Sequence, residues 1–448
     1  MLEGRSCLVS RALPSSCEQE TKWAYMSSCR VEVEIPNGKR RLDPDREGEG
    51  GLRKTIKVSD VEEKLSRAQI DRHIVSRSQV VDHSENQHQS SEQSDMDCLI
   101  NSIGRDMTIN CLLRCSRADY GSIASLNRSF RKLVKNGEIY RLRRQQKVIE
   151  HWVYFSCRLL EWVAFDPASR RWMQLPRMNS NECFMCSDKE SLAVGTELLV
   201  FGKDLMSHVI YKYSILTNSW SSGMSMNSPR CLFGSASLGE LAILAGGCDS
   251  QGNILSSAEL YDSENQTWVT LPSMIKPRKM CSGIFMDEKF YVIGGIGGSD
   301  ARVLTCGEEF DLTTRTWREI PNMSPGNRGA APENEMPAAA EAPPLVAVVN
   351  NELYAADYAD MEVKKYNKET KEWATVGRLP ERAGSMNGWG LAFRACGQRL
   401  IVIGGPRAHG EGIIEVNSWE PSEGPPHWEL LGTKQSGSFV YNCAVMGC

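Results

Sequence analysis

Cysteines, histidines and a glycine-rich segment are the residues of this chain that could bind a metal or a cofactor. Cys183 and Cys186 form a single Cys-x-x-Cys pair, which supplies half the ligands of a tetrahedral zinc site. The sequence places no second pair and no histidine beside it, so we expect no zinc there. Gly294–Gly298 follows a strand-like apolar run but opens no helix, which argues against a dinucleotide-binding turn. We therefore predict no catalytic residue, no metal site and no cofactor.

Arginine recurs in turn-rich segments of the second half of the chain, at Arg230, Arg278, Arg328 and Arg382. A guanidinium group can hold a carboxylate or a phosphate through paired hydrogen bonds. Four such groups around one rim would form a face that binds an acidic or phosphorylated segment of another protein. The alternative is that each arginine braces its own structural repeat. The position of these segments in the fold distinguishes a binding face from internal braces.

Composition bounds the possible classes of protein. The chain has 448 residues, 52 Lys and Arg against 56 Asp and Glu, and a net charge of -4, which gives no bulk preference for nucleic acid or for an anionic membrane. No apolar run reaches the length of a membrane span. The 16 cysteines, without a signal-peptide pattern, fit reduced thiols. We expect a soluble protein of the nucleus or cytoplasm, or of both.

Tryptophan recurs with a period of about fifty residues through the later part of the chain. The six positions are Trp172, Trp220, Trp268, Trp317, Trp373 and Trp428, at intervals of 48, 48, 49, 56 and 55 residues. Most follow an aromatic and a polar residue, as in Tyr261-Asp262 and Phe310-Asp311. Apolar runs upstream end in paired glycines at 246–247, 294–295 and 404–405. A repeated structural unit is therefore predicted.

Each period predicts four short strands, in the fourth case 282–286, 289–295, 306–311 and 316–320. One such sheet cannot bury both faces alone, whereas sheets stacked around a circle bury one another. Strand, double glycine, aromatic-Asp and Trp in this order resemble the kelch repeat. The resemblance covers residues 148–448 and implies a mainly β fold, a six-bladed kelch β-propeller.

Ring closure can be predicted from the two ends of the repeat region. Trp152–Phe155 corresponds to the second strand of its period, so the first period lacks an inner strand. Ser438–Met446 forms a single strand-like run after the sixth tryptophan. We expect this last strand to complete the first sheet and fasten the ring.

The spacing of apolar residues in 96–147 predicts a small unit of three helices. Its first helix lies between Cys98 and Cys115, a second runs from a Ser116-x-x-Asp119 cap to a stop at Asn136-Gly137, and a third covers Ile139–Val148. A unit of this size has only marginal stability alone, so we expect it to pack against a partner or against the following domain. Residues 1–95 are rich in Ser, Glu, Gln and Arg and predict a disordered N-terminal tail.

The helical unit resembles an F-box. Ile103–Asp106 matches the start of the family's first helix, Arg114–Ser116 its end, and Ser125–Arg131 its basic-aromatic-basic core. The family's usual proline, cysteine and tryptophan are replaced by Gly104, Asn127 and Phe130. With the repeats that follow, the chain resembles a plant F-box/kelch-repeat protein of the Skp-interacting-partner type.

This resemblance implies the substrate-recognition subunit of an SCF-type cullin ubiquitin ligase. The F-box would dock on a Skp-type adaptor, which links it to the cullin-RING ligase, and the propeller would hold an unknown protein substrate. Such a receptor acts by proximity and is not an enzyme. The apolar residues expected at the adaptor, or in the unit's own core, are Ile103, Ile109, Leu112, Leu113, Leu126 and Phe130.

The sequence leaves two alternative functions open. A kelch scaffold or interaction protein unconnected with ubiquitination would show the same repeats. Some kelch propellers are secreted copper oxidases, but this chain has no signal-peptide pattern and only isolated histidines in its later repeats, at His208, His409 and His427. We therefore expect no nucleic acid, membrane or metal among its ligands.

Overall fold

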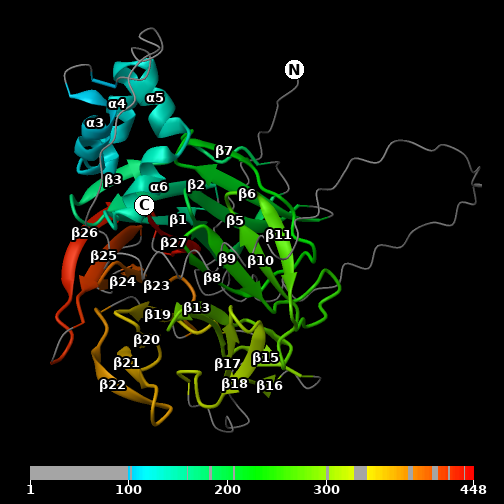
Figure 1. Cartoon of the computed structure of the whole chain (residues 1–448). Coiled ribbons are helices and arrows are strands. Elements are labelled where there is room, and N and C mark those ends of the chain that lie inside the picture. Colours follow the sequence, from blue (N-terminus) through cyan, green and yellow to red (C-terminus); the bar gives the residue numbers. More distant parts are fainter. Residues whose placement is uncertain are drawn as a thin grey trace, which may run out of the picture.

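The structure is a computed structural model of the whole chain, and it consists of a ring of β-sheets with a small group of helices on one side (Figure 1). It describes residues 99–100, 103–158, 160–180, 184–204, 207–298, 302–326, 341–381, 387–405, 412–421, 424–437 and 439–448. The predicted disordered tail, residues 1–95, lies outside the described residues. The mainly β fold is confirmed.

Six four-stranded antiparallel sheets, here called blades 1 to 6, account for most of the strands. Blade 1 contains β27 (Asn442–Gly447), β1 (His151–Arg158), β2 (Glu161–Asp166) and β3 (Arg171–Gln174). Blade 2 contains β4 (Met185–Val194), β5 (Glu197–Lys203), β6 (His208–Ser214) and β7 (Ser219–Ser222). Blade 3 contains β8 (Gly234–Leu238), β9 (Leu241–Ala245), β10 (Ala258–Asp262) and β11 (Thr267–Leu271).

The second half of the ring repeats this arrangement. Blade 4 contains β13 (Ser282–Met286), β14 (Lys289–Ile293), β17 (Gly307–Asp311) and β18 (Thr316–Ile320). Blade 5 contains β19 (Val346–Val349), β20 (Glu352–Asp357), β21 (Glu362–Asn367) and β22 (Glu372–Arg378). Blade 6 contains β23 (Ala392–Cys396), β24 (Arg399–Gly404), β25 (Ile413–Trp419) and β26 (Glu429–Gln435). Short strands β12 (Arg278–Lys279), β15 (Ile296–Gly297) and β16 (Arg302–Val303) form a separate three-stranded sheet.

The innermost strands meet in the order β27, β4, β8, β13, β19, β23 and back to β27. The ring is therefore a closed six-bladed propeller. Its closing strand is β27, which pairs antiparallel with β1 from His151 opposite Gly447 to Ser156 opposite Asn442. This confirms the prediction that the last strand completes the first sheet.

Five of the six recurring tryptophans occupy equivalent places on the outermost strands, and Trp428 directly precedes β26. Trp268 lies opposite Tyr261 and Trp317 opposite Phe310, each pair with ring centroids 4.8 Å apart. At Trp220, Trp268, Trp317 and Trp428 the indole N–H donates to a backbone carbonyl at the end of the preceding blade. The distances are 2.9 Å from Trp268 to Met224 and 2.8 Å from Trp317 to Pro272. One residue type therefore fills space inside its own blade and also fastens that blade to its neighbour.

Five apolar clusters fill the gaps between blades 2 and 3, 3 and 4, 4 and 5, 5 and 6, and 6 and 1. The sixth, between blades 1 and 2, extends into the helices. At the end of β9, Gly246 and Gly247 both have positive φ, and a Cβ on either would lie 2.4 Å from a backbone oxygen. The double glycine is thus needed for a turn that no larger residue fits.

The helical unit consists of α3 (Gly104–Leu113), η2 (Arg117–Asp119), α4 (Tyr120–Leu126), α5 (Arg128–Lys135) and α6 (Glu138–Gln145). The prediction of one helix between Ser116 and Asn136 was wrong. Asn127 is extended, with φ -156° and ψ 174°, and its side chain accepts a 2.8 Å hydrogen bond from the Phe130 N–H. Because Asn127 caps α5, the segment divides into two helices there.

We predict that a chain shortened to end at Gly437 will lose cooperative folding. The deletion removes β27, whose buried Cys443, Ala444 and Met446 contribute to two interblade clusters. Each fully buried large apolar side chain contributes about 1.5–3 kcal/mol, against a total stability of about 5–15 kcal/mol. Thermal unfolding followed by circular dichroism measures the loss. Leu430→Ser, at a side chain with 46% exposure, should melt like the unaltered chain. A truncated chain that melts like the full chain would contradict the closure.

Candidate functional site

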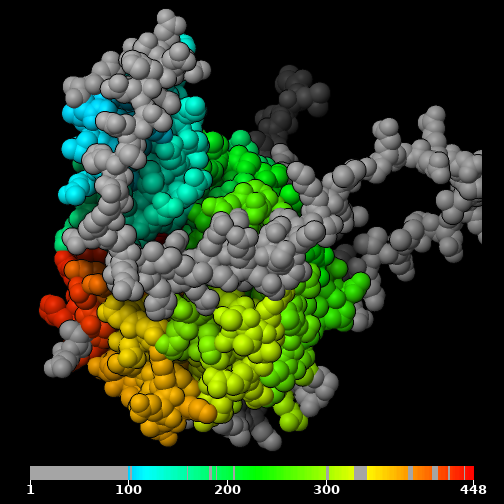
Figure 2. Space-filling model, in the orientation of Figure 1, coloured from blue at the N-terminus to red at the C-terminus, as the bar shows by residue number. Residues whose placement is uncertain are grey.

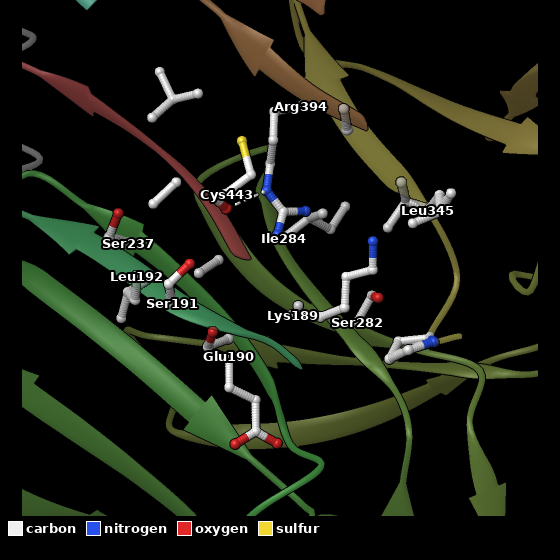
Figure 3. A pocket seen from close by; sticks show the side chains of 18 of the residues that line it. Lys189, Glu190, Ser191, Leu192, Ser237, Ser282, Ile284, Leu345, Arg394 and Cys443 are labelled. Atoms are coloured by element: carbon white, nitrogen blue, oxygen red, sulfur yellow. Dashed lines mark hydrogen bonds between the residues drawn. The ribbon is translucent and has the colours of Figure 1, made fainter. Parts of the chain in front are cut away.

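A cavity of about 270 Å³ lies at the centre of the propeller (Figure 3). Its wall includes residues from all six innermost strands. Leu232, Cys281 and Leu345, which directly precede or enter blades 3, 4 and 5, also line it. The cavity therefore extends toward the face where the chain passes from one blade to the next, here called the loop face. In each blade the loop between the second and third strands opens on this same face.

Cationic and hydroxyl side chains extend into this cavity. Figure 3 shows Arg394 from β23 and Lys189 from β4 directed inward, with Ser191, Ser237 and Ser282 around them. The Arg394 Nε–H donates to the carbonyl of Cys443 at 3.1 Å, so the guanidinium is held by blade 1. Sequence reasoning missed these residues, because only the closed ring brings the six inner strands together.

Arg230 and Arg278 do not lie on a binding surface. Their exposures are 1% and 0%, and each guanidinium pairs with a buried carboxylate of its own blade. Arg230 Nη2 lies 2.7 Å from Glu259 Oε1, and Arg278 Nη2 lies 2.6 Å from Glu308 Oε1. The prediction that these two arginines contact a substrate was wrong, because they are the internal braces of blades 3 and 4.

The two braces have the same design. In blade 4, Arg278 also donates to the carbonyls of Gly294 and Cys306, at 2.9 and 3.1 Å, while Glu308 accepts from the backbone N–H of Ile275 and Lys276. The pair thus holds the interblade loop to the second and third strands. Arg328 and Arg382, the other predicted substrate-face residues, lie outside the described residues, and their role stays a prediction.

Four of the six predicted adaptor residues form the interior of the helical unit. Exposures of Ile109, Leu112, Leu113 and Phe130 are 8%, 7%, 1% and 6%. These four belong to the apolar cluster shared with blades 1 and 2, so they stabilise the unit and are not available to a partner as the structure stands. The prediction that they contact an adaptor is corrected accordingly. The expectation that the unit packs against the following domain is confirmed.

The remaining two predicted residues are exposed, Ile103 at 44% and Leu126 at 71%. Met107 on α3 has 60% exposure and lies one helical turn after Ile103, so it is a third exposed apolar residue of the unit. The sequence carried a signal for Met107, because it recurs at the helical interval of its apolar neighbours. These three residues are here called the exposed apolar set.

Arg117 joins the helical unit to the propeller from within. Its side chain is buried, and its Nη1 and Nη2 donate to Cys448 Sγ at 2.8 Å and to Tyr154 Oη at 2.5 Å. The guanidinium also lies over the Trp152 ring, 4.6 Å from the centroid. Burial raises the pKa of the Tyr154 hydroxyl to about 12, although the Arg117 charge acts in the opposite direction. One cation thus contacts both the second strand of blade 1 and the residue after its closing strand.

Glu150 connects Arg117 with a second buried arginine, Arg143. The Glu150 carboxylate accepts from the Arg117 backbone N–H, at 3.0 and 3.2 Å, and from Arg143 Nη2 at 2.7 Å. Arg143 Nη1 donates to the carbonyls of Leu113 and Cys115, so α6 is tied to the end of α3. Glu150 and Cys448 exchange backbone hydrogen bonds of 3.1 Å, which extends the β1–β27 ladder by one pair.

The helical unit lies on the side of the propeller opposite the loop face. Arg144 on α6 pairs with Glu240 in the turn between the first and second strands of blade 3. Leu216, in the turn between the third and fourth strands of blade 2, packs against the helical cluster. Both turns open on the other face from the interblade loops. Figure 2 shows the unit, in blue and cyan, standing beside the green blades.

Comparison with known proteins identifies the kelch repeats and the family of the chain. The family model described as Kelch motif matches residues 229–275 and 277–324, which correspond to blades 3 and 4. The F-box/kelch-repeat protein SKIP11 of Arabidopsis thaliana is 63% identical over the whole of both chains. The chain belongs to the F-box/kelch-repeat family. F-box/kelch-repeat protein At1g26930 of the same plant is 58% identical, and At1g74510 is 57% identical, again over the whole of both chains.

The family relation assigns names to the two parts. The propeller contains kelch repeats, and the helical unit, residues 103–145, is called the F-box below, after the names of the relatives. Among the described residues, no cluster of three or more His, Cys, Asp or Glu side chains could hold a metal ion. No described helix is long and apolar enough to cross a bilayer.

We predict that Arg278→Ala destabilises the kelch propeller by about 3–5 kcal/mol, because the Glu308 carboxylate would stay buried without its cation. The control is Arg318→Ala. Arg318 pairs with Glu309 at 3.0 Å, but its side chain is 69% exposed, and such a pair contributes about 0–1 kcal/mol. Urea unfolding of both variants measures the difference. If the two variants lose equal free energy of unfolding, the buried pair contributes no more to stability than the exposed one, and the prediction is wrong.

We also predict that Arg117→Met will loosen the F-box from the propeller while most of the ring stays folded. The variant removes the donors to Tyr154 and Cys448. Hydrogen exchange should therefore rise in residues 103–145 more than in blades 3 to 5. As a matched control, Arg114→Met changes a neighbouring arginine that is exposed. Unchanged exchange in the F-box of Arg117→Met would refute this role.

Proposed function

We propose that this chain is the substrate-recognition subunit of an SCF-type cullin ubiquitin ligase. Its F-box docks on a Skp-type adaptor, and its kelch propeller binds the protein to be ubiquitinated. The receptor itself carries no catalytic group. The names of its relatives support the family, and the exposed apolar set on the F-box carries the proposal for this chain.

The exposed apolar set is the observation of most weight. Large apolar side chains that stay exposed together in one region of a surface commonly mark a contact with a partner. The F-box core is filled by Leu113, Phe130 and their neighbours, so Ile103, Met107 and Leu126 add nothing to it. Of the eleven Lys and Arg between residues 105 and 150, seven are exposed, against four Asp or Glu in all, which suits an acidic partner.

The attachment of the F-box supports a mechanism based on position. A receptor accelerates transfer by keeping its substrate near the charged ubiquitin carrier, and a fixed orientation increases that effective concentration. Arg117, Arg143 and Glu150 fix the F-box to blade 1 through buried polar contacts. A substrate on the loop face and an adaptor on the F-box would occupy opposite sides of the propeller and would not compete.

The second candidate function is a kelch scaffold that is not linked to ubiquitination. It keeps the same propeller and assigns the exposed apolar set to another partner. Capture by a purified Skp-type adaptor separates the two candidates, because the scaffold function does not require it.

We predict that Met107→Asp and Leu126→Asp each weaken capture of a purified Skp-type adaptor by at least about tenfold, which corresponds to about 1.4 kcal/mol. A charge placed in an apolar interface loses its hydration without gaining a partner. Because both side chains are exposed, the variants should keep the melting temperature of the unaltered chain. Pull-down followed by titration calorimetry measures the effect.

Met224→Asp is the matched control, since Met224 is 53% exposed and lies after blade 2, away from the F-box. It should bind the adaptor like the unaltered chain. Absence of capture by the unaltered chain would contradict the ligase function. Normal capture by Met107→Asp and Leu126→Asp would show that the adaptor uses another surface.

A further inference from the structure

Two cysteines face each other where blade 3 begins on the loop face. Cys231 belongs to the segment that enters the blade, and Cys248 follows its double glycine. Their Sγ atoms are 3.5 Å apart. Their backbones form an antiparallel bridge in which each N–H donates to the carbonyl of the other, at 3.0 and 2.7 Å. Both thiols are free.

This geometry fits a disulfide bond. Opposed residues that exchange both backbone hydrogen bonds have Cα atoms about 5.5 Å apart. Disulfides most often join Cα atoms about 5.5–6 Å apart, and their sulfurs lie about 2.05 Å from each other. A small rotation of the two side chains would therefore bring the sulfurs into bonding distance without a change in the backbone.

The electrostatic surroundings favour reaction at Cys248. The hydrogen bond between the two thiols lowers the pKa of Cys248, with Lys279 and Lys203 acting in the same direction. Burial and Asp249 oppose them. The same hydrogen bond, burial and the nearby Glu190 raise the pKa of Cys231. A thiol of lowered pKa beside a second thiol that can resolve its oxidised form is the arrangement found in reactive cysteine pairs.

We propose that Cys231 and Cys248 form a reversible disulfide under oxidation by a peroxide. The Cys248 thiolate attacks one peroxide oxygen and becomes a sulfenic acid, while the O–O bond breaks and hydroxide leaves. The Cys231 sulfur then attacks the sulfenic sulfur, and its proton leaves with the hydroxyl group as water. The two sulfurs lose two electrons in total, and hydrogen peroxide is reduced to water. A dithiol reductant reverses the bond by exchange.

The disulfide would join two segments of blade 3 at the edge of the central cavity. Leu232, which lines the cavity, donates its N–H to the Glu190 carboxylate of blade 2, and its carbonyl accepts from the Met280 N–H at 2.8 Å in front of blade 4. A disulfide at the neighbouring Cys231 fixes this junction to the loop that begins at Cys248. If the loop face binds the substrate, as the proposed function holds, the disulfide changes the stiffness of that face. Its formation does not depend on that function.

Peptide mapping of the full chain tests the proposal. Trypsin cleaves after Arg230 and Arg278, and the peptide between them contains Cys231, Cys248 and no other cysteine. After treatment with hydrogen peroxide, free thiols are blocked with iodoacetamide in denaturant. We expect this peptide to lose both alkyl groups, to be two hydrogen atoms lighter than its reduced form, and to regain alkylation after dithiothreitol.

Cys281 is the internal control. It is buried like Cys248, with exposures of 1% and 4%, but burial raises its pKa to about 11 and its Sγ donates to the Ala245 carbonyl rather than to another thiol. It should stay fully alkylatable after the same peroxide treatment. Cys231→Ser and Cys248→Ser should each abolish the lighter peptide, and peroxide should raise the melting temperature of the unaltered chain but of neither variant. Full alkylation of the peptide after peroxide, or oxidation of its cysteines to sulfinic acid without the lighter form, would overturn the proposal. Adaptor capture is independent of either result.

Discussion

The pairing of β27 with β1 is the constraint on which the rest of this structure depends. Side chains of β27 alternate between two interblade clusters, with Ala444 and Met446 facing blade 2 and Cys443 and Val445 facing blade 6. This alternation follows from the two-residue period of a strand. Without β27, blade 1 would have three strands, and two of the six interblade clusters would lose one wall. The same strand leads to Cys448, which contacts Arg117. The strand that closes the ring therefore also supplies a contact that holds the F-box.

Four buried arginines of the described residues have two structural roles. Arg230 and Arg278 brace blades 3 and 4, while Arg117 and Arg143 attach the F-box. Burying a charge costs several kcal/mol of desolvation, so such pairs define an arrangement more than they add stability. In blades 2 and 5, Tyr211 and Lys364 occupy the position of Glu259 and Glu308. The family model matches only the two braced blades.

The periodic features of the fold could be predicted from the sequence because they repeat. Six in-phase tryptophans, aromatic-Asp pairs and double glycines were enough for the blade number, the strands of blade 4 and the ring closure. The burial of Arg230 and Arg278 could not be predicted in this way, since the partner carboxylate lies about thirty residues later in each case. A signal did exist, because Glu259 and Glu308 both stand two residues before the aromatic of the repeat.

The F-box was harder to predict for a related reason. Its helices repeat nothing, and an apolar residue at a helical interval can face either its own core or a partner. Asn127 turns the chain between α4 and α5, so Leu126 points to solvent while Phe130 is buried. A continuous helix would have placed these two residues on one face, four positions apart. The exposure of Leu126 thus depends on a single cap, and a partner that recognises Leu126 also recognises the break that Asn127 creates.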